Sequence, residues 1–274
     1  MRWWAAVGNQ VADVVGGLPG TGWGAELRCL VVAHRHGDPM QLYLIRHGQS
    51  LVNLADWAHG NSDEGLTDLG RQQAQAVAQR LATGSDRIDV LYASTMRRAH
   101  ETATFVSRAL DLPILPDDRI REIGNNRLDH APWPDVPTDY GDFWATSRPF
   151  ASVTPGVEQG ESLMHFRTRV GAFLEELRLD RAGQQVVAVT HGGVIDAVFD
   201  HMFNVGPWRH CQVWTSNASV TQVELLDDTP RDNGVAHGGP ERWRLHRHND
   251  VGHLDAVPTP APFAADGASG QARR

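Results

Sequence analysis

Strand-length apolar runs alternate with helical stretches through most of the chain, and this alternation is the strongest constraint on its fold. The apolar runs lie at 40–45, 88–92, 112–115, 185–190, 220–226 and 243–245, and the helical spacing of apolar residues covers 67–81, 97–110, 162–179 and 194–203. Alternating strands and helices bury their apolar surfaces best when helices cover both faces of a sheet. We therefore predict an α/β fold, a three-layer α/β/α sandwich with a mostly parallel central sheet.

The irregular segments divide the chain into a core and three less regular parts. Residues 1–39 are interrupted by glycines and are expected to form an N-terminal extension, which lies upstream of the true start if that start is Met40. Residues 40–249 are expected to form one domain. Within it, residues 123–160 are rich in proline and aromatic residues and are expected to form an irregular lid. Residues 250–274 are expected to form a disordered tail.

The basic residues are all arginines, which excludes several kinds of chemistry. The chain has 25 Lys and Arg residues in total, and no lysine occurs among them. Nucleotide binding by a Walker A loop, Schiff-base catalysis and the protein-kinase mechanism all depend on a lysine. If the protein binds anions, it must do so with arginine, histidine, backbone N–H groups or helix N-termini.

Charge and cysteine content narrow the expected partners and location. The formal net charge of −8 argues against nucleic-acid binding, which usually requires a basic surface. The chain has 2 cysteines, which form no disulfide framework and indicate a reducing, cytoplasmic compartment. An apolar run of about 18 residues, the length needed to span a membrane, is absent from the sequence, so no membrane association is expected.

Polar residues suited to phosphate binding follow three of the predicted strands directly. Arg46 and His47 follow the run at 40–45, His191 follows the run at 185–190, and Arg98 lies shortly after the run at 88–92. In open α/β sheets, ligands bind just beyond the carboxyl ends of the strands. These side chains are therefore expected to meet at one edge of the sheet.

Five motifs in a fixed order resemble those of the histidine phosphatase superfamily, the phosphoglycerate mutase-like proteins of the RHG-motif branch. They are RHGQS at 46–50 with Asn53, LTDLGRQQA at 66–74, STMRRAHETA at 94–103, GES at 160–162 and THGG at 190–193. The resemblance covers roughly residues 40–226.

The resemblance implies a catalytic role for His47, whose neutral imidazole would attack phosphorus and form a phosphohistidine. Arg46, Arg98 and His191 would stabilise the phosphoryl oxygens, and Asn53 would donate a further hydrogen bond to them. Such a mechanism requires no cofactor and no metal. A guanidinium suits it because its planar fork binds phosphate with two donors and stays charged.

Glu122 matches the family position of the proton donor for the leaving oxygen. It lies in Ile120-Arg-Glu-Ile123, but the sequence departs from the family at Asn125-Asn-Arg127, where an aromatic residue and glycine usually follow. Four other carboxylates remain candidates for the acid, with less suitable spacing: Asp117, Asp118, Asp129 and Glu101.

The preferred interpretation is a phosphatase that hydrolyses a phosphomonoester through a phosphohistidine intermediate, with a small phosphorylated molecule as its substrate. One alternative is a phosphoglycerate mutase, which would pass the phosphoryl group to a second hydroxyl. The residues after Glu122 lack the basic and aromatic pattern of family mutases. A second alternative is a non-catalytic phosphoryl-binding module, although the nucleophile and arginines that such a module would have lost are present. A homodimer is compatible with the sequence.

Three smaller questions stay open at this level. A second Arg-His-Gly triplet ends at Gly37 but lacks the downstream Ser and Asn, so His36 is a weak rival to His47. Neighbouring helical residues point about 100° apart, so only one of Arg97 and Arg98 can face the site, and the motif spacing favours Arg98. Glu161 and Ser162 serve either to start a helix or to bind substrate.

Overall fold

The computed structural model describes residues 39–54, 63–124, 149–153, 161–209, 212–226 and 242–257 of the chain. These residues form six strands, β1 (Met40–Arg46), β2 (Val90–Ser94), β3 (Ile114–Asp117), β4 (Gln185–Thr190), β5 (Val220–Leu226) and β6 (Arg242–Asp250). The α-helices are α1 (Leu51–Leu54), α2 (Asp68–Thr83), α3 (Arg97–Leu110), α4 (Leu163–Asp180) and α5 (Gly192–Met202). Two short 3₁₀ turns, η2 (Asp118–Ile120) and η3 (Gly252–Leu254), complete the described elements.

The strands form one mixed sheet in the order β3-β2-β4-β1-β5-β6. Strands β3, β2, β4 and β1 pair in parallel. Strand β5 is antiparallel to β1, and β6 is antiparallel to β5. The prediction of an α/β fold with a mostly parallel sheet is therefore confirmed, and the carboxyl ends of β1, β2 and β4 lie at the same edge.

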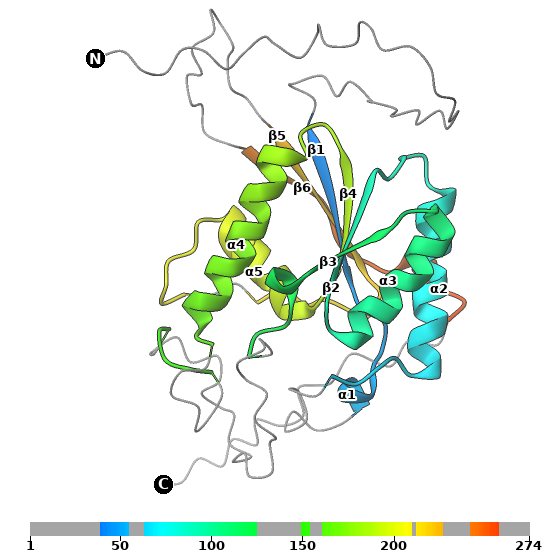
Figure 1. Ribbon diagram of the computed structural model, residues 1–274, viewed down its shortest axis with the longest axis horizontal. Helices are drawn as coiled ribbons and strands as arrows, with labels where there is room; N and C mark the ends of the chain where they lie inside the picture. The colour runs from blue at the N-terminus through cyan, green and yellow to red at the C-terminus, as the bar shows by residue number, and fades with distance from the viewer. Residues whose placement is uncertain are drawn as a thin grey trace, which may run out of the picture. The chain divides into compact units, whose positions relative to one another are not determined.

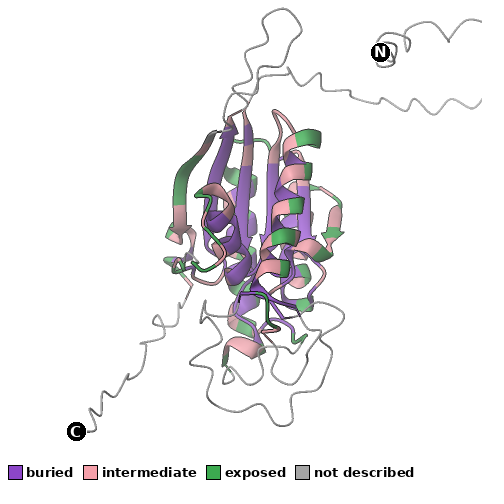
Figure 2. Cartoon of the chain, turned by 90° about the vertical axis from the view of Figure 1, so that its left-hand side faces the viewer, coloured by how far each residue is buried: buried purple, intermediate pink, exposed green. Residues whose placement is uncertain are grey.

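Helices cover both faces of this sheet, with α2 and α3 on one face and α4 and α5 on the other (Figure 1). Strand β1 supplies both layers because its side chains alternate between the faces. Leu42 and Leu44 join the core beside α4 and α5, whereas Tyr43 and Ile45 join the core beside α2 and α3. Figure 2 shows the result, with buried central strands between helices that expose their outer surfaces, and with less buried strands at the edges of the sheet.

Side-chain caps start two of the helices at the predicted positions. The Thr67 hydroxyl accepts a hydrogen bond from Gly70 N at 3.0 Å and caps α2, at the start of the helical stretch expected over 67–81. Ser162 caps α4 by accepting a hydrogen bond from His165 N at 3.1 Å. For Ser162, this contact answers the open question in favour of a helix start.

The C-terminal boundary predicted at residue 249 is wrong for residues 250–257. Strand β6 runs to Asp250, and Leu254 in η3 is buried against the layer that contains α2 and α3. Asp250 also forms an ion pair with Arg80 of α2. These contacts join residues that are far apart in sequence, so the local composition of the tail gave no sign of them. The rest of the predicted tail, the predicted extension up to residue 38 and most of the predicted lid lie outside the described residues.

Two glycines bring the loop after β1 into direct backbone contact with α2. A Cβ atom added at Gly70 would overlap the carbonyl oxygen of Gln49, and one added at Gly48 would overlap the carbonyl oxygen of Gly70. Gln73 of α2 fixes the same loop, since its Oε1 accepts a hydrogen bond from Gln49 N at 2.8 Å. The absence of a side chain at Gly70 therefore sets how closely this loop packs.

Replacement of Gly70 by alanine should lower the free energy of unfolding by about 2–3 kcal/mol, because the new methyl group must displace backbone atoms. Gly84 is the matched control, since a Cβ there would meet only ordinary contacts and its φ is negative. Gly84→Ala should change stability by no more than about 1 kcal/mol. Urea unfolding of both variants measures the difference, and equal stabilities would contradict the close packing at Gly70.

Candidate active site

His47 lies directly after β1, and its backbone and ring are both held by neighbouring atoms. Its backbone N–H donates to the Thr190 carbonyl of β4 at 2.9 Å. Its ring Nδ1 lies 2.7 Å from the Gly48 carbonyl oxygen, and only a protonated Nδ1 can donate to that oxygen. The ring is 3% exposed. The neutral ring therefore carries its proton on Nδ1 and keeps a lone pair on Nε2.

Arg98 approaches the same ring from the first turn of α3. Its Nε donates to His47 Nε2 at 3.1 Å, and the side chain is buried. Arg97 points elsewhere, is largely exposed and pairs with Glu101 at 2.8 Å. Of these two neighbouring arginines, Arg98 is therefore the one that contacts His47.

His191 begins α5 at the end of β4, and its ring packs edge-on against the ring of His47 with 5.1 Å between centroids. The register of the sheet explains this contact, since Arg46 of β1 pairs with Thr190 of β4. His191 Nε2 lies 2.8 Å from the Ser94 hydroxyl at the end of β2. Its Nδ1 is buried and has no hydrogen-bond partner among the described residues.

Arg46 ends β1, and its side chain lies near Gly192, at the start of α5. One of its terminal nitrogens donates to the Thr215 carbonyl. Its Nε is buried and, within the described part of the chain, has no hydrogen-bond partner. The segment that includes Thr215 is in turn tied to α5, because Asp196 accepts a hydrogen bond from Val213 N at 2.8 Å.

Asn53 lies in α1 near the same loop, with its amide oxygen already occupied. This oxygen accepts hydrogen bonds from the backbone N and the hydroxyl of Ser50, both at 3.0 Å. It also accepts one from Asn217 Nδ2 at 3.2 Å, and the same Nδ2 donates to the His47 carbonyl at 3.0 Å. The Asn53 amide nitrogen is therefore the group that remains for a ligand.

Glu122 extends from the turn after η2 toward the start of α5. Its carboxylate accepts hydrogen bonds from Ile123 N at 2.9 Å and from Gly193 N at 3.3 Å. A Cβ at Gly193 would overlap this carboxylate, so a larger residue there would displace the Glu122 side chain. The negative charge acts on both Arg46 and Arg98, which places Glu122 at the same edge as the other predicted residues.

The pocket holds its arginines and histidines in different charge states. Burial lowers the pKa of His47 well below its usual value, and the charges of Arg98 and Arg46 lower it further. Burial and the Arg98 charge lower the pKa of His191 in the same way. Burial also lowers the pKa of Arg98 to about 10, which leaves it charged at neutral pH. Two neutral imidazoles therefore lie among cationic guanidinium groups.

The six predicted site residues thus meet at one edge of the sheet, whereas the described rivals for the acid, Glu101, Asp117 and Asp118, bond to other side chains. Glu101 pairs with Arg97, and Asp117 pairs with Arg119 at 2.6 Å. Asp118 is exposed and accepts a hydrogen bond from the Thr95 hydroxyl at 2.5 Å. Asp129 and His36 lie outside the described residues.

Sequence reasoning missed four residues that line or support the pocket. Thr215 and Asn217 contact Arg46 and His47 across some 170 positions of sequence, and Asp196 supports them. Burial raises the pKa of Asp196 to about 7, and the nearby Glu122 charge contributes. Arg121 is buried and donates to the Thr95 hydroxyl at 2.7 Å. The sequence signal for these residues is weak because each is a single polar residue that lies outside the recognised motifs.

The described residues lack two features, a group of side chains that could bind a metal and a helix that could span a membrane. No group of three or more His, Cys, Asp or Glu side chains among them has an arrangement that could hold a metal ion. None of the helices within the described ranges is both long and apolar enough to cross a membrane.

Comparison with known proteins agrees with this geometry. "Probable phosphoglycerate mutase GpmB" of Escherichia coli (strain HS) is 27% identical over 217 residues, which cover 79% of this chain and 96% of the relative. The solved structure of a mycobacterial glucosyl-3-phosphoglycerate phosphatase with VO3 is 28% identical, with a TM-score of 0.56 and coverage of 77% of this chain and 99% of that one.

A phosphoserine phosphatase from Entamoeba histolytica, solved with 3-phosphoglyceric acid, shares the fold with a TM-score of 0.59 and 23% identity, over 78% of this chain and 99% of that one. The family model of the histidine phosphatase superfamily (branch 1) matches residues 42–236. This match confirms the resemblance that the five ordered motifs indicated. The chain belongs to the histidine phosphatase superfamily.

Proposed function

We propose that this chain is a phosphatase that hydrolyses a small phosphomonoester through a phosphohistidine on His47, with Glu122 as the proton donor. The observation that carries the proposal is the state of the His47 ring. Its Nδ1 is tied to the Gly48 carbonyl, so the lone pair on Nε2 faces Arg98 in a buried pocket. A neutral imidazole with this orientation is a competent nucleophile toward phosphorus.

Two buried donors beside His47 support a phosphoryl site. Arg46 Nε and His191 Nδ1 have no hydrogen-bond partner among the described residues. In the proposed tautomer, the Ser94 hydroxyl donates its proton to His191 Nε2 while it accepts a hydrogen bond from Met96 N. This arrangement leaves the His191 proton on Nδ1, where it can be donated. Phosphoryl oxygens would satisfy both groups, whose burial is otherwise costly.

The reaction then has two steps. In the first, His47 Nε2 forms a bond to phosphorus, the ester P–O bond breaks, and Glu122 gives its proton to the leaving oxygen. In the second, a water oxygen bonds to phosphorus, the N–P bond breaks, and Glu122 takes the proton that the water loses. Arg46 and Arg98 stabilise the charge on the phosphoryl oxygens in both steps.

Phosphoglycerate mutase activity is the second candidate, and the names of the curated relatives favour it. A mutase would return the phosphoryl group to a second hydroxyl of its substrate instead of to water. Two observations favour hydrolysis: the residues after Glu122 lack the mutase pattern, and the mycobacterial structural relative is named as a phosphatase. Both reactions use the same phosphohistidine, so product analysis separates them.

The wild-type protein should release inorganic phosphate from members of a phosphometabolite panel, and His47→Ala should lower this rate by about 10³-fold or more. His36→Ala, in the second Arg-His-Gly triplet, is the matched control and should keep the wild-type rate. Phosphate release and the interconversion of 2- and 3-phosphoglycerate are measured on the same samples. Interconversion with little phosphate release would identify a mutase, and wild-type turnover by His47→Ala would refute the phosphohistidine mechanism.

Glu122→Gln should lower the kcat for hydrolysis of phenyl phosphate about 10²-fold or more, and it should lower the kcat for p-nitrophenyl phosphate much less. The two esters have similar shapes, but nitrophenolate leaves with little need of a proton and phenolate does not. The ratio of kcat values for the two esters is the measurement. If both esters slow equally, Glu122 does not act as the proton donor to the leaving group.

The His47 ring should remain neutral, with its proton on Nδ1, at pH 6.0. Because burial and two nearby cations lower its pKa, protonation is expected only well below pH 6.5. The ring is then protonated at a lower pH in the folded protein than in the unfolded chain. The free energy of unfolding therefore falls as the pH drops below about 6.5. Nitrogen-15 NMR titration of the ring, assigned with His47→Gln, tests this. A midpoint at or above 6.5 would contradict the proposed electrostatics.

A further inference from the structure

The turn that carries Glu122 has no regular secondary structure, yet its backbone is extensively bonded. Residues 121–124 belong to neither a strand nor a helix. The carbonyl oxygens of four consecutive residues, Arg119 to Glu122, nevertheless each accept a hydrogen bond from a side chain. Side chains here take the place of the backbone ladder that would hold such carbonyls in a sheet.

One side chain of α4, Arg169, binds three of these four carbonyls. Its Nη1 donates to the Arg119 carbonyl at 2.6 Å and to the Arg121 carbonyl at 2.8 Å. Its Nη2 donates to the carbonyl of Glu122 itself at 3.1 Å. The fourth carbonyl, of Ile120, accepts from the Thr190 hydroxyl at 2.9 Å, beside His191.

Glu161 holds Arg169 in this position. The Arg169 Nε donates to Glu161 Oε1 at 2.6 Å and Nη2 donates to Glu161 Oε2 at 3.0 Å. The Glu161 side chain is only 2% exposed, and its Oε2 also accepts a hydrogen bond from Gly124 N at 3.0 Å. The ion pair therefore contacts the turn on both sides of Glu122.

These contacts use the whole bonding capacity of a guanidinium group. Arg169 makes five hydrogen bonds, and a guanidinium has five N–H donors. A lysine at this position could offer three donors from a single nitrogen and could not span the same set of oxygens. The geometry thus depends on arginine and on more than its charge.

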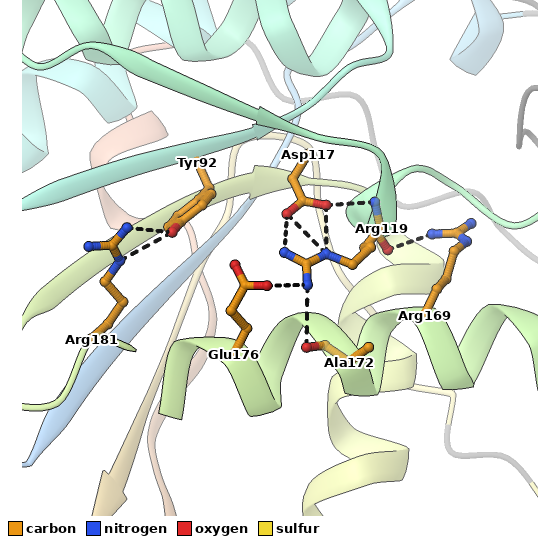
Figure 3. Close-up of polar contacts among 7 residues, drawn as sticks. All are labelled: Tyr92, Asp117, Arg119, Arg169, Ala172, Glu176 and Arg181. Carbon is orange, nitrogen blue, oxygen red and sulfur yellow. Dashed lines mark hydrogen bonds and ion pairs between the residues drawn. The ribbon is translucent and has the colours of Figure 1, made fainter. Parts of the chain in front are cut away.

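A second arginine crosses the same interface in the opposite direction, as Figure 3 shows. Arg119 extends from η2 to α4, where it pairs with Glu176 at 2.7 Å, and it pairs with Asp117 at 2.6 Å. Arg169 extends from α4 to the carbonyl of that same Arg119. The two contacts fix the segment before Glu122 against α4.

We infer that Arg169, held by Glu161, is a positioning residue for the Glu122 carboxyl group. The inference depends on the proposed role of Glu122 as proton donor. Among the described residues, a long hydrogen bond of 3.3 Å from Gly193 N is the one contact that links the Glu122 carboxylate to the rest of the pocket, so its placement depends on its backbone. A shift of about 1 Å at a reacting group can cost on the order of 10²-fold in rate.

Arg169→Lys tests the inference through the kcat ratio of phenyl phosphate and p-nitrophenyl phosphate. We expect phenyl phosphate to slow by about 10-fold or more and p-nitrophenyl phosphate by less than about 3-fold, since only the former needs a well-placed acid. Arg167→Lys is the matched control on the same helix. Arg167 also binds backbone carbonyls, but those of Val205, Gly206 and Arg209, so its loss should leave the ratio unchanged.

A second comparison separates positioning from general stability. In the Glu122→Gln background, Arg169→Lys should not change the ratio of kcat values any further, because the carboxyl group that Arg169 positions has already been removed. If Arg169 had a purely structural role, Arg169→Lys would lower Tm and reduce kcat equally for both esters. That result would overturn the inference. If Arg169→Lys does not fold, Glu161→Gln carries the same test, because it weakens the hold on Arg169 and keeps the side-chain shape.

The outcome also distinguishes this inference from the proposed function. An unchanged ratio in Glu122→Gln would reject Glu122 as the acid, whatever Arg169 does. A changed ratio in Glu122→Gln with an unchanged ratio in both Arg169→Lys and Glu161→Gln would leave the proposed function standing and reject the positioning role.

Discussion

The parallel pairing of β1 with β4 is the contact on which the rest of the pocket depends. It sets Arg46 beside Thr190 and so brings His47 and His191, the residues that follow, to the same edge of the sheet. The His47 backbone continues this pairing for one more residue, through its hydrogen bond to Thr190. Because a parallel register slip would separate the two rings, the many apolar side chains that both strands bury also fix the spacing of the polar groups.

Burial of these polar groups explains their electrostatic properties. The two imidazoles are nearly inaccessible, and the arginines beside them disfavour a further positive charge. A buried cation that lacks full pairing is costly in the free protein, and that cost is reduced when an anion binds. The chain as a whole has a net charge of −8, yet this edge is locally cationic. Local field and net charge can thus differ in sign, as a phosphate site in an acidic protein requires.

The sequence predicted the parts of this arrangement that depend on local pattern. Apolar runs marked β1 and β4, and the polar residues at their ends were expected to meet because parallel strands end at the same edge. The face of α3 that carries Arg98 followed from motif spacing, and Arg97 lies on the other side as predicted. The extent of β6 could not be predicted, since its pairing with β5 and the Arg80–Asp250 contact join distant segments.

The supporting residues were beyond prediction for the same physical reason. Asn217 contacts the His47 carbonyl through a turn that follows the fourth parallel strand by some 27 positions, with no local pattern to mark it. Glu161 was recognised as part of a motif, but its contacts were not predicted. Ser162 caps α4, whereas Glu161 binds Arg169 and Gly124.

The use of arginine as the only basic residue besides histidine also has a structural consequence. Some irregular segments of this fold have carbonyl groups that no neighbouring strand satisfies, and guanidinium groups bind several of them at once. Arg169 does so for the turn of Glu122, and Arg167 does so for residues 205–209. A lysine could bind a phosphate as a point charge, but it could not bridge three carbonyls and a carboxylate. The same side-chain geometry that suits Arg46 and Arg98 to an oxyanion therefore also suits Arg167 and Arg169 to hold irregular backbone.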